Sequence, residues 1–204
     1  MMKKIVLIAV ALLASVVLIS FMGSNELKPS ELIHWVENQE NGLTQSKAIN
    51  EFIFEAQYKP VDYVVSLEAR KDDVTENEYQ QLKSELDGLQ YIDLTIGTNA
   101  GQGNALSGGI QNEDEYYQRL DYFVTYANQD IYLIQGQDTL WPQLYHFERN
   151  YGLAPSNTLL LGFEKGNSEE DRNLIIDDQV LGVGRVKFLF EKENINSTPN
   201  LKTI

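Results

Sequence analysis

An uncharged apolar stretch from Ile5 to Gly23 constrains this chain more than any other feature of its sequence. As a helix rising about 1.5 Å per residue it would measure about 28 Å, close to the ~30 Å hydrocarbon core of a bilayer. Lys3 and Lys4 precede it and favour a cytoplasmic position for that end. We therefore expect residues 1–24 to form a membrane anchor, with the rest of the chain exported. The apolar anchor residues are Ile5, Leu7, Leu12, Leu13, Val17, Leu18 and Phe21.

This segment has two other interpretations, a cleaved signal peptide and a buried core helix. A cleaved signal peptide has a core of about 7–15 apolar residues and small residues around the cleavage site, whereas Phe21 and Met22 occupy the end of this run. A core helix buried in the protein would need apolar partners on every side, so the membrane is favoured. The anchor and the signal peptide both imply export, and whether the segment is cleaved stays open.

Residues 25–204 have the length of a single domain. The whole chain has a net charge of −14, and the part after Lys3 and Lys4 has −16. Such a field repels phosphate backbones, which argues against a nucleic-acid partner. The chain has no cysteine, which excludes disulfides, thiolate metal sites and thiol nucleophiles. An exported, acidic, cysteine-free domain suits a bacterial cell envelope, such as the periplasm.

Helical signals lie mainly in the first half of this domain. The spacing of Leu32, Trp35 and Val36 predicts a helix over residues 31–39, which Asn41-Gly42 ends. Thr75 and Glu78 form a capping box before a second helix. A third helix begins after Asn112, with acidic residues in its first turn where the helix dipole favours them. Residues 61–67 fit either a helix or a strand. The apolar stripe of the third helix comprises Tyr116, Leu120, Phe123, Val124 and Ala127.

Strand signals occur in both halves of the domain and dominate the second. Residues 52–58 alternate between apolar and polar, as does the stretch from Trp141 to Glu148. Shorter segments that are predicted to form strands lie at residues 91–96, 131–134, 159–163, 174–176 and 186–190. This order predicts an α+β fold with a mostly antiparallel sheet and three or four helices concentrated in the N-terminal half. The polar tail from about residue 194 is expected to fray.

A glycine-rich loop spans residues 97–111 and contains Gly101 and Gly103. A dinucleotide-binding loop would need a third glycine where Leu106 stands and a helix directly after it, so this interpretation fails. We interpret the segment as a mobile surface loop or as a flexible loop that contacts a partner. Capture of a small molecule or of calcium near it is an alternative.

The sequence gives only weak evidence for a metal site or for acid–base catalysis. His146 and Glu148 share one face of a predicted strand, but the only other histidine, His34, has no local link to them. We expect neither a metal nor a cofactor. Paired carboxylates such as Asp72-Asp73 and Asp177-Asp178 leave a carboxylate-dependent envelope hydrolase as an alternative function.

Aromatic residues give the stronger functional signal. Tyr117, Tyr122 and Tyr126 surround the third predicted helix, of which only one side can face the core, and tyrosine is a frequent interface anchor. We expect these tyrosines, with Gly101 and Gly103, to contact a partner protein. The sequence thus favours a membrane-tethered or exported, non-enzymatic protein-interaction or assembly module.

Overall fold

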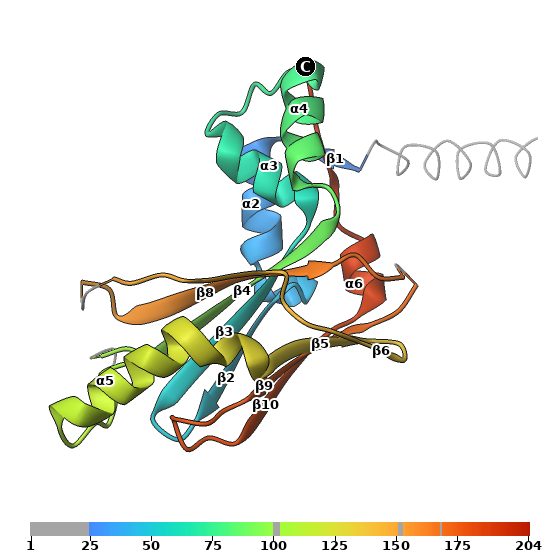
Figure 1. Cartoon of the computed structure of the whole chain (residues 1–204). Coiled ribbons are helices and arrows are strands. Elements are labelled where there is room, and N and C mark those ends of the chain that lie inside the picture. Colours follow the sequence, from blue (N-terminus) through green and yellow to red (C-terminus); the bar gives the residue numbers. More distant parts are fainter. Residues whose placement is uncertain (1–24, 100–102, 151–152, 168) are drawn as a thin grey trace, which may run out of the picture.

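The computed structural model describes residues 25–99, 103–150, 153–167 and 169–204 (Figure 1). The predicted anchor, residues 1–24, and Gly101 lie outside the described residues. The described part is an α+β fold with mostly antiparallel sheets, as the sequence predicts, and it contains five α-helices rather than three or four. The helices are α2 (Pro29–Glu37), α3 (Val61–Ala69), α4 (Glu76–Leu86), α5 (Glu113–Asp121) and α6 (Lys192–Asn196).

Two antiparallel sheets form the body of the domain. The larger has the order β2-β3-β4-β8-β7 and the smaller β10-β9-β5-β6. The larger sheet comprises β2 (Thr44–Ile49), β3 (Phe52–Lys59), β4 (Leu89–Thr98), β7 (Leu144–Phe147) and β8 (Ser156–Glu164). The smaller comprises β5 (Ile131–Gln135), β6 (Asp138–Leu140), β9 (Arg172–Asp177) and β10 (Arg185–Phe190).

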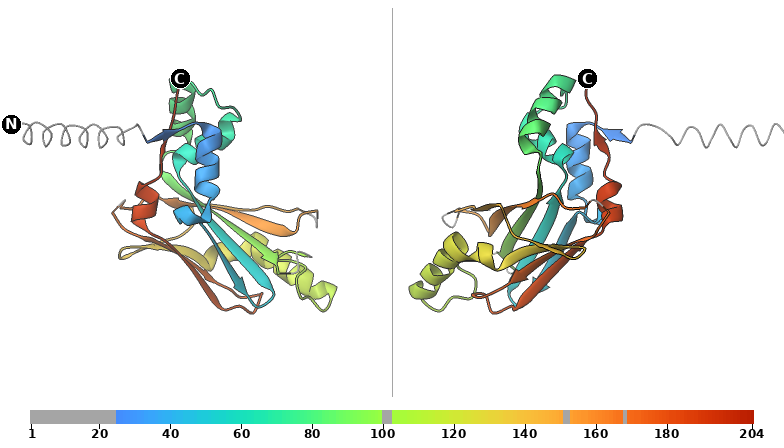
Figure 2. Two further views of the ribbon diagram at one scale, coloured as in Figure 1. Left: turned by 180° about the vertical axis from the view of Figure 1, so that it is seen from behind. Right: turned by 45° about the vertical axis from the view of Figure 1, so that its right-hand side comes forward.

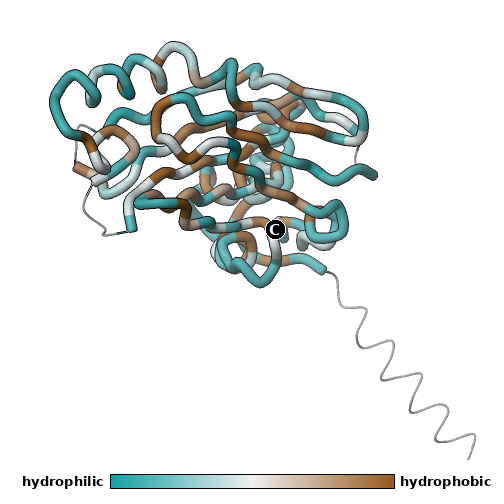
Figure 3. The backbone as a smooth tube through the Cα atoms, turned by 90° about the horizontal axis from the view of Figure 1, so that it is seen from below, coloured by the Kyte–Doolittle hydropathy of each residue, from teal (hydrophilic) through white to brown (hydrophobic). Residues whose placement is uncertain are grey.

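The core lies between the inward faces of the two sheets. The apolar residues predicted on one face of residues 52–58 and of residues 186–190 are buried, and Tyr58 of β3 meets Phe190 of β10 with ring centroids 5.8 Å apart. Apolar and polar positions alternate along these strands (Figure 3), as expected when one face of each sheet is buried. The strands contribute Phe52, Phe54, Ile92, Leu94, Leu133, Leu159, Leu161, Leu174 and Phe188 to this core.

Side chains close one seam between the sheets. The Nε2 of Gln45 on β2 donates to the carbonyl oxygen of Leu189 on β10, and the Nζ of Lys47 donates to that of Lys187. Strand β2 has no clear strand signal in the sequence, because most of its residues are polar and only Thr44 is buried. At the other side, the chain passes from β6 to β7 through residues 141–143.

A helical layer covers one end of this body. Helices α2, α3 and α4 lie together there (Figures 1 and 2). Residues 61–67, which fit either a helix or a strand by sequence, belong to helix α3. The predicted capping box of α4 is confirmed, because the Thr75 side chain accepts from the Glu78 N–H and the Glu78 side chain accepts from the Thr75 N–H. Three short helical segments complete the fold: η1 (Gln39–Asn41), η2 (Tyr122–Tyr126) and η3 (Ala127–Gln129).

The C-terminal residues, for which the sequence predicts fraying from about residue 194, make tertiary contacts with the rest of the domain. Strand β11 (Asn200–Leu201) pairs in parallel with β1 (Glu26–Leu27), and Leu201 is buried. The N–H of Ile204 donates to the carbonyl oxygen of Val74. The polar composition of this tail does not predict these contacts, because backbone groups make most of them.

The described residues contain no helix that is long and apolar enough to cross a membrane.

Candidate functional site

Helix α5 begins at a well-defined cap and runs along the outside of the body. The side chain of Asn112 accepts a hydrogen bond from the N–H of Glu115 at 3.0 Å, as predicted. Three acidic residues occupy the first turn, where they interact favourably with the helix dipole. Helix α5 lies at the opposite end of the domain from β1 and the helical layer (Figure 2).

A π-helical turn, η2, continues α5. The N–H of Ala127 donates to the carbonyl oxygen of Tyr122, five residues earlier, and such insertions occur frequently at functional sites. The turn changes which side chains face inward: Tyr122 and Phe123 are buried, whereas Val124 and Tyr126 are exposed. The extra residue explains why a regular helical stripe does not describe this segment.

Tyr122 is therefore a core residue, unlike the other two tyrosines predicted to contact a partner. Its hydroxyl donates to Asp130 Oδ2 at 3.0 Å. Burial, and to a smaller extent the Asp130 carboxylate, raises the pKa of Tyr122. Tyr117 and Tyr126 are 60% and 49% exposed, so the structure places these two predicted contact residues at the surface.

Strand β7 lies beside η2 and is held to it by aromatic contacts. The ring of Phe147 stacks on that of Phe123 with centroids 5.5 Å apart, and the Tyr145 hydroxyl donates to the Phe123 carbonyl oxygen. Burial raises the pKa of Tyr145. These contacts fix the position of β7, which is the last strand of the larger sheet.

Between α5–η2 and β7 the surface is hollowed in two adjoining places. One hollow, of about 250 Å³, is lined by Tyr117, Leu120, Asp121, Val124 and Arg149. The other, of about 220 Å³, is lined by Val124, Tyr145, His146, Phe147 and Arg149. Because Val124 and Arg149 line both, the hollows form one continuous depression, which we call the α5–β7 groove.

The weak metal candidates lie at this groove but do not form a metal site. His146 lines it, and Glu148 follows directly after β7 with its N–H bonded to the carbonyl oxygen of Thr158. His34 lies on α2, in the helical layer at the other end. The described residues contain no group of three histidine or acidic side chains able to hold a metal ion.

The described part of the glycine-rich loop is packed rather than loose. Asn104, Ala105 and Leu106 are buried, and the Thr98 hydroxyl donates to the carbonyl oxygen of Gly103. Arg119 of α5 is also buried and donates from Nη1 to the carbonyl oxygens of Ala105 and Gly108. The loop therefore positions α5, a role that its glycine content does not reveal.

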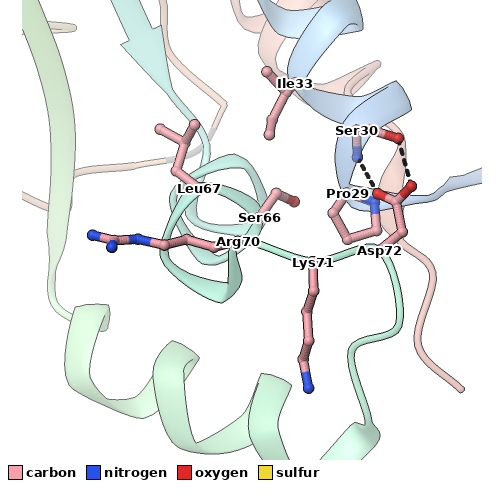
Figure 4. A pocket seen from close by; sticks show the side chains of 8 residues that line it. All are labelled: Pro29, Ser30, Ile33, Ser66, Leu67, Arg70, Lys71 and Asp72. Atoms are coloured by element: carbon pink, nitrogen blue, oxygen red, sulfur yellow. Dashed lines mark hydrogen bonds between the residues drawn. The ribbon is translucent and has the colours of Figure 1, made fainter.

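A separate hollow of about 360 Å³ lies between α2 and α3 (Figure 4). Its walls include Pro29, Ile33 and Leu67, and the N–H and hydroxyl of Ser30 both donate to the Asp72 carboxylate. The backbone hydrogen bond from Ser30 is the main reason that the pKa of Asp72 is lowered. Asp72 thus links the loop after α3 to the first turn of α2.

Carboxylate pairs of the kind that a hydrolase needs are not found in the hollows described above. The α5–β7 groove and the α2–α3 hollow each contain one carboxylate, Asp121 and Asp72. The pKa of Asp93 is raised by burial, but its carboxylate is paired with Lys59 at 2.8 Å. Asp93 therefore has the environment of a structural ion pair.

Fold and site together define a two-sheet α+β domain with a helical layer at one end and an aromatic groove near the other. No protein-family profile, curated protein or solved structure matched the chain.

Proposed function

We propose that this chain is a membrane-tethered, exported interaction module that binds a protein partner through the surface around the α5–β7 groove. One observation carries the proposal: Tyr117 and Val124, which are 60% and 37% exposed, line the groove, and Tyr126, 49% exposed, lies in the same η2 turn as Val124. Tyrosine supplies a large contact area with few rotatable bonds, so it anchors protein interfaces efficiently.

The placement of this surface supports a tethered module. The chain enters the described domain at β1, next to the helical layer, while α5 lies at the far end (Figures 1 and 2). A tether formed by residues 5–23 would leave the α5–β7 groove directed away from the bilayer. The net charge of −16 on the part of the chain after Lys3 and Lys4 disfavours contact of the exposed domain with anionic lipid and nucleic acid.

Site-specific photocrosslinking in intact membranes tests the binding surface. A photoreactive benzoylphenylalanine is introduced at Tyr117 or at Tyr126 of the full chain, and in a control at Leu67, an exposed residue of α3. We expect a discrete crosslinked product from positions 117 and 126 that is absent from position 67. Identical patterns from all three positions, or no product from 117 and 126, would contradict the proposal.

Fractionation tests the tether separately. The full chain should remain in membranes washed with alkaline carbonate and should be degraded by protease added from the non-cytoplasmic side. A full chain found free in the cytosol would refute the membrane part of the proposal, whatever the crosslinking shows.

A further inference from the structure

We propose that the α5–β7 groove binds an extended peptide segment of the partner, which adds a strand to the outer edge of β7 and places a carboxylate against Arg149. This inference rests on the proposed function and specifies its mode of recognition. Addition of a peptide strand to an exposed sheet edge is a general binding mode, in which backbone hydrogen bonds give affinity and pockets for alternate side chains give specificity.

The backbone of β7 is suited to such pairing. Strand β7 pairs with β8 on one side, and no strand of the described residues pairs with the other side. The N–H of Glu148 donates to the carbonyl oxygen of Thr158, which sets the alternation of the antiparallel ladder. By that alternation the N–H and C=O groups of Tyr145 and Phe147 point away from β8, toward the groove.

The groove offers apolar contacts along this edge. On the helical side Leu120 and Val124 line it, and on the strand side Tyr145 and Phe147 do. Successive residues of an extended peptide point to opposite sides. We therefore expect alternate residues of the bound peptide to be apolar, with their side chains against Leu120 and Val124.

The charge of the groove specifies one further feature of the peptide. Arg149 lines both hollows and forms no ion pair with any described residue. Asp121 lines the groove and Glu148 precedes Arg149 in the chain, and His146, Tyr117 and Tyr145 are the other titratable groups in the lining. Because the whole domain is acidic, a strongly acidic peptide would be repelled. A single carboxylate opposite Arg149, within an otherwise apolar segment, would pair with the arginine without adding enough negative charge to be repelled by the domain.

A display experiment supplies the probe. The full-length protein in lipid nanodiscs is panned against random nine-residue linear peptides, and selected peptides are synthesised for affinity measurements. We expect selected sequences to share alternate apolar residues and one aspartate or glutamate. Failure to select any peptide that binds the groove would overturn the inference.

Backbone methylation distinguishes strand addition from side-chain docking. N-methylation of one alternating set of peptide amides removes the hydrogen bonds to β7, whereas methylation of the other set does not. We expect the first set to weaken binding by about tenfold or more and the second to have little effect. Hydrogen exchange at the amides of Tyr145 and Phe147 should slow when peptide binds. Equal effects of both sets, with unprotected amides, would overturn strand addition.

A matched pair of arginine variants tests the charge. Arg149→Gln should weaken binding of the acidic peptide about tenfold and should have little effect on a peptide carrying glutamine instead. Arg70→Gln, at an exposed arginine in the helical layer, serves as the control and should bind like the unchanged protein. Equal affinities of Arg149→Gln and the unchanged protein would overturn the role of the carboxylate.

The outcomes separate this inference from the function on which it rests. Crosslinks from Tyr117 in membranes, together with a failure of strand addition, would support partner binding at this surface and reject the addition of a peptide strand to β7. Absence of those crosslinks would reject the surface itself.

Discussion

The side-chain hydroxyl of Tyr145, on the edge strand β7, donates a hydrogen bond to the backbone carbonyl oxygen of Phe123, in the π-helical turn after α5. This bond joins the two walls of the α5–β7 groove. It also pairs a carbonyl oxygen in a segment where the regular helical pattern is interrupted. The walls that α5–η2 and β7 give the groove are therefore part of the packed structure, and Arg149 follows directly after them in the chain.

Replacement of Tyr145 by phenylalanine tests this link. Tyr145→Phe leaves the Phe123 carbonyl without this donor, so we expect the free energy of unfolding to fall by about 1–3 kcal/mol. Urea denaturation measures the change. Tyr117→Phe alters an exposed tyrosine and should change stability by less than about 0.5 kcal/mol. Equal effects of the two substitutions would show that the hydrogen bond does not stabilise the groove.

A close approach at Gly108 gives a second prediction. A Cβ atom there would lie 2.7 Å from Cγ2 of Thr98 and 2.8 Å from Cε1 of Phe52, so Gly108→Ala should destabilise the domain by about 1–3 kcal/mol. A double-mutant cycle with Phe52→Leu checks the cause, because the smaller side chain relieves part of the clash. Strictly additive effects would contradict this explanation.

The C-terminal strand provides a third prediction. Leu201 is 6% exposed, and Leu201→Ala should lower the free energy of unfolding by about 2–5 kcal/mol. Ile204, three residues later, is 71% exposed, so Ile204→Ala should change stability by less than about 0.5 kcal/mol. Thermal or urea unfolding of both variants measures the difference. If neither substitution has an effect, the tail is not docked in solution.

The hydrogen bonds that Glu78 accepts from Lys71 and Thr75 should make stability depend on pH in the acid range. A hydrogen bond from Lys71 is the main reason that the pKa of Glu78 falls from 4.5 to about 2, and further bonds from Thr75 add to it. A carboxylate with a lowered folded-state pKa contributes stability above pH 4.5 that is lost as the pH falls toward 2.

Unfolding measured between pH 5 and pH 2 tests this dependence. Glu78→Gln should lose less stability over that range than the unchanged protein. Glu55→Gln, at an exposed carboxylate on β3, is the control and should follow the unchanged protein. Parallel pH curves for Glu78→Gln and the unchanged protein would refute the assignment.

Local sequence signals predicted the elements whose formation depends on near neighbours. The caps at Thr75 and Asn112 are where the sequence places them, because their partners lie three residues away. The alternating strands at residues 52–58 and 186–190 bury the predicted faces, because one-sided burial leaves a period of two in the sequence. The α+β class follows from these elements together.

Elements fixed by distant residues were missed or misplaced. Strand β2 is polar and owes its position to β3 and to side-chain bonds with β10, which is more than a hundred residues away. Helical periodicity does not predict the burial of Tyr122, because the π-helical turn interrupts the regular spacing. Asn200 and Leu201 carry no local strand signal, since β1 supplies their partner groups.

The sequence by itself determined the fold class, the main caps and the buried faces of the strands, as well as the surplus of tyrosines around residues 116–126. Tertiary structure alone decided which of those tyrosines are exposed and that β7, His146 and Arg149 meet α5 in one groove. The reason is physical: periodicity records whether a residue faces a core, whereas a surface site depends on which elements become neighbours when the whole chain packs.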